Sequence, residues 1–237
     1  MTTWEENVMK TLSAIVLMLI LVPTAFCAGL YWESEMVTTG APGGDKTDMI
    51  KTFHAGYAVR IEQADSITIM DLKSGKIYSL DPKSKSYREI NVDEMFKGGK
   101  DEQAAQEFVA KMMEDVKVEK TSETRKIGDF NCTKYIVTMM GVNSVYWMTD
   151  DVKEFSNLRD ETLKYADKFK NNPMLQKSLS MAGGIEKLSG FMIEVTSEVS
   201  LGTKPIKTTN TVKKVEKKDF DAATFAVPSD YTKMVSN

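Results

Sequence analysis

The feature that most constrains this chain is a two-residue alternation of apolar and polar side chains that recurs through its first third. Residues 30–37 alternate in this way, and residues 57–62, 67–70 and 77–80 continue the pattern. Segments rich in Gly, Pro, Asp, Ser and Lys separate them at intervals of about ten residues, which is typical of strands joined by tight turns. The alternation therefore predicts an antiparallel meander, with one face toward water and the other toward a core or a cavity.

The rest of the chain mixes helical and strand patterns. In residues 101–116 the apolar side chains recur at i, i+3, i+4, i+7 and i+8, which is the spacing of one helical face. A second helical pattern covers residues 151–170, and a third, shorter one covers 172–184. Strand-forming residues fill the segments 121–126, 131–141, 144–148, 191–201 and 207–215. We expect one α+β domain, a twisted antiparallel sheet of roughly nine strands with helices inserted in two places.

The N-terminal segment has the pattern of a signal peptide. Residues 12–22 are apolar apart from one serine, and a proline and several small residues follow. Ala25 and Cys27 would occupy the −3 and −1 positions of cleavage, so residues 1–27 form the expected signal and 28–237 the mature domain. Glu5 stands where positive charge is expected, and we therefore expect translation to start at Met9. The prediction is a protein exported to the periplasm.

Two other fates of this segment stay open. Residues 12–32 carry no charge, a length of about 20 residues that would also suit an uncleaved membrane anchor. Lipidation at Cys27 is the second alternative, although Phe26 occupies the place where a small residue is usual. If the signal is removed after Cys27, Cys132 is the single thiol of the mature chain, and we expect it to act as a small buried hydrophobe.

Composition excludes several kinds of function. The formal net charge is −3, so there is no basic excess for binding nucleic acid phosphates. The chain has one histidine, His54, which cannot build a His-rich metal site and has no evident triad partner. Adjacent methionines such as Met112 and Met113 point in different directions and cannot chelate one metal ion together. We expect a protein without enzymatic activity, cofactor or metal.

The order of strands and turns resembles a known family. The segments that carry the likeness are residues 31–36, 57–62, 67–71 and 76–87, followed by 127–135 and 225–228. They are similar to periplasmic domains of the LolA/LolB-like superfamily, and most similar to the family called domain of unknown function 4412. The resemblance implies a half-barrel, in which a curved antiparallel sheet has an apolar concave face covered by helices. It also implies that lipid or lipoprotein acyl chains are candidate ligands.

The apolar stripes of the predicted strands supply the candidate binding residues. Methionine suits a cavity that adapts to ligands of different shape, and the same stripes would equally suit a solid core. The residues expected to face the cavity are Trp32, Met36, Tyr57, Val59, Ile61, Ile67, Ile69, Phe108, Met112, Trp147 and Met192. The first hypothesis is an exported carrier or sensor of a hydrophobic ligand. The alternative is a cell-envelope module with a filled core that binds a protein partner.

Overall fold

The computed structural model of the protein describes residues 26–92, 116–139, 141–166, 188–201 and 204–234. Most of these residues form strands. The first six strands are β1 (Phe26–Thr39), β2 (Lys46–Ala55), β3 (Ala58–Glu62), β4 (Ile67–Asp71), β5 (Lys76–Asp81) and β6 (Ser86–Asn91). The later ones are β7 (Lys117–Ile127), β8 (Phe130–Met139), β9 (Val142–Thr149), β10 (Phe191–Leu201), β11 (Lys204–Asp221) and β12 (Thr232–Lys233). Two helices accompany them, α3 (Glu154–Ala166) and the 3-10 helix η2 (Ala222–Phe225).

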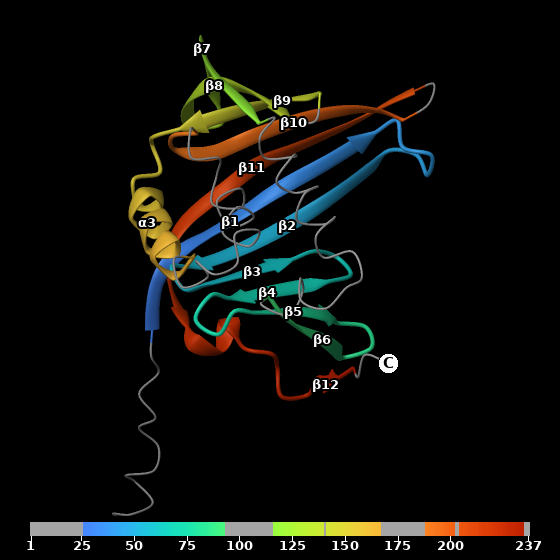
Figure 1. Ribbon diagram of the computed structural model, residues 1–237, viewed down its shortest axis with the longest axis vertical. Coiled ribbons are helices and arrows are strands. Elements are labelled where there is room, and N and C mark those ends of the chain that lie inside the picture. Colours follow the sequence, from blue (N-terminus) through green and yellow to red (C-terminus); the bar gives the residue numbers. More distant parts are fainter. Residues whose placement is uncertain (1–25, 93–115, 140, 167–187, 202–203, 235–237) are drawn as a thin grey trace, which may run out of the picture.

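All the strands belong to one open sheet. It has 12 strands in the order β12-β6-β5-β4-β3-β2-β1-β11-β10-β9-β8-β7. Neighbouring strands are antiparallel except for the short pair β12–β6, which is parallel. The long strands β1, β2, β10 and β11 cross the middle of the molecule, and the meander of β3 to β6 continues from β2 on one side (Figure 1). The prediction of an antiparallel sheet is therefore confirmed, with more strands than expected.

Aspartates at strand ends explain why the meander turns where it does. Asp71 Oδ1 accepts a hydrogen bond from the Lys73 amide at 2.9 Å, and Asp81 Oδ1 accepts one from the Lys83 amide at 2.8 Å. Such side-chain bonds to the backbone two residues ahead favour a turn over a continued strand. Gly75 and Lys85 complete the two turns with positive φ angles of 68° and 47°. The residues that we identified as turn signals thus form the turns.

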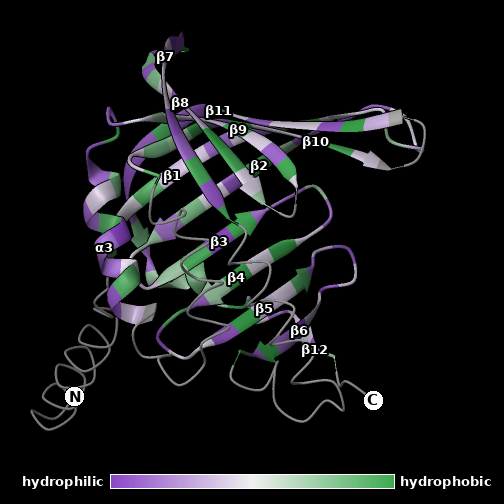
Figure 2. Cartoon of the chain, turned by 45° about the horizontal axis from the view of Figure 1, so that its top comes forward, coloured by the Kyte–Doolittle hydropathy of each residue, from purple (hydrophilic) through white to green (hydrophobic). Residues whose placement is uncertain are grey.

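The sheet curls around the face that carries Trp32 and Val59, which we call the inner face; the opposite one is the outer face. Strands β4 and β9 are separated by five other strands, and would lie roughly 29 Å apart in a flat sheet. Met70 of β4 and Tyr146 of β9 nevertheless border one cavity on the inner face. Figure 2 shows β7 and β8 bending across the rest of the sheet.

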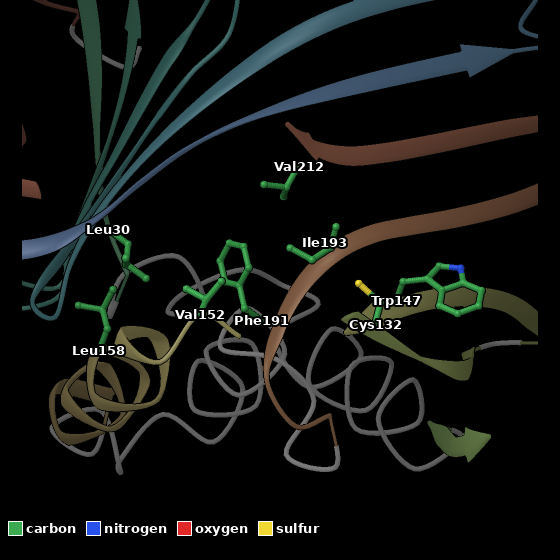
Figure 3. Close-up of a cluster of buried hydrophobic side chains, with 8 residues drawn as sticks. All are labelled: Leu30, Cys132, Trp147, Val152, Leu158, Phe191, Ile193 and Val212. Carbon is green, nitrogen blue, oxygen red and sulfur yellow. The ribbon is translucent and has the colours of Figure 1, made fainter. Parts of the chain in front are cut away.

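Helix α3 closes one end of the inner face. Its side chain Leu158 packs with Leu30 of β1 and Phe191 of β10 in a buried cluster (Figure 3). Phe155 lies against Phe191, with ring centroids 5.1 Å apart. The helix predicted over residues 151–170 is confirmed from Glu154 to Ala166, and residues 151–153 lie before its start. The predicted helices at 101–116 and 172–184 lie outside the described residues.

The C-terminal segment covers part of the outer face. Phe220 and Phe225 pack on each other and on Ala55, Ala58 and Ile69 in a second buried cluster. Asp221 caps η2 by accepting a hydrogen bond from the Ala223 amide at 2.9 Å. The outer face therefore has an apolar core of its own over β1 to β5. The sequence prediction, which placed water on this side of the meander, was wrong there because the covering segment is distant in sequence.

Three strands were not predicted. β2 and β6 flank predicted strands, and β12 is only two residues long. In β2 the alternation is weak, because polar and apolar residues are mixed on both faces of Lys46–Ala55. β1 begins at Phe26, so the last two residues of the expected signal, Phe26 and Cys27, are paired with β11. The remaining residues of that segment lie outside the described part of the chain.

Candidate functional site

The inner face encloses a cavity of about 550 Å³ between the sheet and α3. Its wall is mainly apolar, and seven strands and one helix contribute to it. The apolar and aromatic lining residues are Trp32, Ile50, Val59, Ile61, Met70, Leu72, Tyr146, Met148, Phe155, Leu163, Leu188, Phe191 and Met192. A volume of this size and an apolar lining are typical of small-molecule pockets.

Four of the predicted residues line this cavity. Trp32 and Val59 come from β1 and β3, Ile61 lies two residues further along β3, and Met192 lies near the start of β10. Strand alternation puts Met36 on the same face as Trp32, but Met36 is not among the residues that border the cavity. Phe108 and Met112 lie outside the described residues.

Ile67 and Ile69 face away from the cavity, contrary to expectation. Residues directly opposite each other in an antiparallel pair share a face. Ile69 pairs with Arg60 and Ile67 pairs with Glu62, whereas Val59 pairs with Met70. Ile69 is therefore buried on the outer face, and Met70 borders the cavity in its place.

Tyr57 and Trp147 were also expected to line the cavity, and neither does. Tyr57 lies in the turn before β3 and packs on Phe225 of the outer cluster, with ring centroids 5.8 Å apart. Trp147 stands between Tyr146 and Met148, the two residues of β9 that line the cavity, so its side chain is on the opposite side of the strand. There the Arg125 guanidinium lies 4.0 Å from the centre of its ring. All three positions in β9 are apolar or aromatic, which hides the alternation.

The sequence reasoning missed the polar strip of the cavity wall. Ser34, Thr52, His54 and Asn210 come from the adjacent strands β1, β2 and β11. Ser34 is 2 % exposed and Thr52 is 5 % exposed. The Oδ1 atom of Asn210 is buried and has no hydrogen-bond partner within the described residues, and such an acceptor costs free energy unless a donor meets it. The available signal was the alternation Ile50, Thr52, His54 in β2.

His54 is a neutral imidazole held between the sheet and α3. Its Nε2 atom lies 3.0 Å from Thr162 Oγ1, and that hydroxyl donates its proton to the Leu158 carbonyl at 2.8 Å. The hydroxyl must therefore accept from His54, which places the imidazole proton on Nε2. Burial lowers the pKa of His54 to about 4, because the charged form would lose its hydration. The His54 and Trp32 rings lie in an edge-to-face arrangement, with centroids 6.2 Å apart.

Arg159 borders the cavity from α3. Helical spacing puts Phe155, Arg159, Thr162 and Leu163 on one side of the helix, and all four line the cavity. Arg159 Nη1 donates a hydrogen bond to the Leu188 carbonyl at 3.2 Å. Arg159 also lines a second pocket with the exposed residues Asp150, Lys153 and Asp160, so it stands between the cavity and the surface.

The described residues offer few other chemical groups. They contain no cluster of three or more His, Cys, Asp or Glu side chains that could hold a metal ion. Cys132 is 1 % exposed, and burial raises the pKa of its thiol, which agrees with the expected small buried hydrophobe. Across the ranges that the structure describes, none of the helices has both the length and the apolar character needed to cross a membrane.

These features define the class of the protein, a curved antiparallel sheet with an apolar cavity on its inner face. The chain belongs to the family called domain of unknown function DUF4412, whose model matches residues 43–231. This agrees with the resemblance inferred from the order of strands and turns. A search of the curated proteins found no match.

Solved structures show remote similarity only. PNGF-II is 13% identical with a TM-score of 0.41, and the match covers 87% of this chain and 31% of that one. This chain therefore spans less than a third of the length of PNGF-II. A LolA superfamily protein from Nitrosomonas europaea is 8% identical with a TM-score of 0.34, and the match covers 86% of this chain and 91% of that one. A DUF1329 family protein from Desulfovibrio piger is 9% identical with a TM-score of 0.35, and the match covers 90% and 94%.

Proposed function

We propose that this protein is an exported, non-enzymatic carrier or sensor that holds a hydrophobic ligand on the inner face of its sheet. The observation that carries the proposal is the cavity of about 550 Å³ with its mainly apolar wall. A wall of this kind gains free energy when it contacts the apolar surface of a ligand in place of water. Methionines at 70, 148 and 192 give the wall adaptable shape.

Blocking the cavity should weaken this binding strongly. Ile50 of β2 borders the cavity, while its neighbour Met49 points to the other side of the strand and is 46% exposed. Ile50→Trp should weaken uptake of a lipid from vesicles about tenfold or more, since overpacking costs about 1–3 kcal/mol. Met49→Trp adds the same indole outside the cavity and should leave uptake unchanged. Native mass spectrometry after incubation with phospholipid vesicles measures the bound fraction.

The outcomes separate the two hypotheses. A lipid adduct in the wild type and in Met49→Trp, lost in Ile50→Trp, supports the carrier. A clean mass for the wild type, both as purified from a membrane-containing source and after incubation with vesicles, would favour the alternative of an envelope module that binds a protein. Circular dichroism of both variants shows whether the sheet is intact.

Export to the periplasm is the second part of the proposal. Its support is the apolar run at residues 12–22, followed by Pro23 and small residues. N-terminal sequencing of the protein from the periplasmic fraction should read Ala28 first. A full-length chain that stays with the membrane would indicate the uncleaved anchor instead. A chain that begins at a lipidated Cys27 would indicate a lipoprotein.

A further inference from the structure

The wall of the cavity carries one cationic side chain among the described residues that line it, and that is Arg159. The other polar lining groups are hydroxyls, amides and the imidazole of His54, which is neutral because burial holds its pKa low. A guanidinium beside an apolar cavity is an unusual choice, because a buried or half-buried charge is costly unless it is paired. The charge therefore needs a partner when a ligand excludes water from this end of the cavity.

Within the described residues, the hydrogen-bonding groups of Arg159 are only partly satisfied. One of its five N–H groups is used by the Leu188 carbonyl, at 3.2 Å. No carboxylate of the described residues forms an ion pair with it, although Lys134, Lys213 and several other cations of this chain do have such partners. The guanidinium fork keeps donors that match a carboxylate or a phosphate, which it binds through two parallel hydrogen bonds.

The position of Arg159 sets the orientation of a bound ligand. Arg159 lies where the cavity meets the surface pocket that also contains Asp150 and Lys153. Ile61, Met70 and Ile50 border the same cavity from β3, β4 and β2. A charged group at Arg159 would remain near water, and a chain attached to it would run over the apolar wall. This is the arrangement that suits an amphiphile.

We infer that the ligand is an anionic amphiphile whose carboxylate or phosphate is bound by Arg159. The inference rests on the proposed function and makes it more specific. A fatty acid and a lysophospholipid share this chemistry, and separate arms of the experiment distinguish them.

The test compares ligands with the same chain and different head groups. Isothermal titration calorimetry below the micelle-forming concentration would use tetradecanoate, tetradecyl phosphate, tetradecanol and tetradecyltrimethylammonium. The wild type should bind one of the two anions roughly 10- to 100-fold more tightly than the alcohol, as expected for hydrogen bonds to a charged group. Tetradecanoate represents a fatty acid, and myristoyl-lysophosphatidylglycerol represents the lysophospholipid. Dimyristoyl phosphatidylglycerol represents an anionic phospholipid with two chains.

Variants on α3 assign the preference to Arg159. Arg159→Gln keeps a donor for the Leu188 carbonyl but removes the charge, and it should make the anion and the alcohol bind equally. Arg159→Lys should keep part of the preference. Lys164→Gln removes a cation from an exposed position of the same helix, outside the cavity wall, and should leave the preference unchanged. If Arg159 had a purely structural role, Arg159→Gln would weaken the binding of all ligands together and would leave the ratio of anion to alcohol affinity unchanged.

Each result supports or contradicts a specific part of the inference. Equal binding of all four head groups by the wild type overturns the anionic inference and leaves the hydrophobic carrier in place, and this holds even where Arg159→Gln fails to fold. If no tetradecyl compound binds, the inference and the proposed function both fail.

Discussion

Replacing Ile69 by alanine should lower the free energy of unfolding by about 3 kcal/mol, within the range measured for buried Ile→Ala changes. Ile69 is 0% exposed and lies in the outer cluster with Ala58, Leu80 and Phe225. Removal of three carbon atoms there leaves a void that the rigid sheet cannot close. Urea unfolding followed by circular dichroism measures the loss. Ligand uptake by the folded variant should stay at the wild-type level, since Ile69 does not border the cavity.

Met70→Ala is the matched control on the next residue of β4. Met70 borders the cavity and is half-buried, so its truncation enlarges an existing space and should cost clearly less stability than Ile69→Ala. It should alter ligand uptake instead. Equal losses of stability in the two variants would contradict the assignment of faces and would mean that the inner side is packed as tightly as the outer one.

The contrast between β3 and β4 shows when the alternation of side chains predicts which residues face the cavity. In β3, Arg60 and Glu62 alternate with Val59 and Ile61, so the charged residues mark one face and the apolar residues the other. The sequence reasoning therefore placed Val59 and Ile61 on the cavity side. In β4, Ile67 and Ile69 alternate with Thr68 and Met70. The residues of β4 therefore show little preference for one face. The register of β4 with β3, which local sequence does not reveal, decides which of them face the cavity.

In β9 and β2, too, the local sequence does not show which residues face the cavity. In β9 the three consecutive residues Tyr146, Trp147 and Met148 suit either face, and the Arg125 side chain that covers Trp147 comes from β7, the edge strand. In β2 the cavity residues are partly polar, so the stripe of Ile50, Thr52 and His54 did not look like a lining. Antiparallel strands and turns could be predicted from local sequence. The polar strip and the covering of the outer face depend on contacts between distant segments.

Lowering the pH from 6.5 to 4 should remove about 3 kcal/mol of stability through His54 alone. Burial lowers the pKa of His54 to about 4 in the folded protein, from the 6.5 of a free imidazole. Between these two values the unfolded chain binds a proton that the folded chain does not, so the free energy of unfolding falls as the pH falls. A shift of about 2.5 units, at 1.36 kcal/mol for each unit, gives this amount. Above pH 6.5 this contribution is fully present and constant.

A variant without the titrating group isolates the effect. His54→Gln keeps a donor that can reach Thr162, and the glutamine side chain does not titrate. The difference in unfolding free energy between wild type and variant should therefore change by about 3 kcal/mol between pH 6.5 and pH 4. His54 is the one histidine of the chain, and NMR of its ring protons can therefore follow the titration directly. A midpoint near 6.5 in the folded protein would contradict the buried, neutral imidazole. It would also mean that water reaches the floor of the cavity beneath α3, where His54 and Trp32 meet.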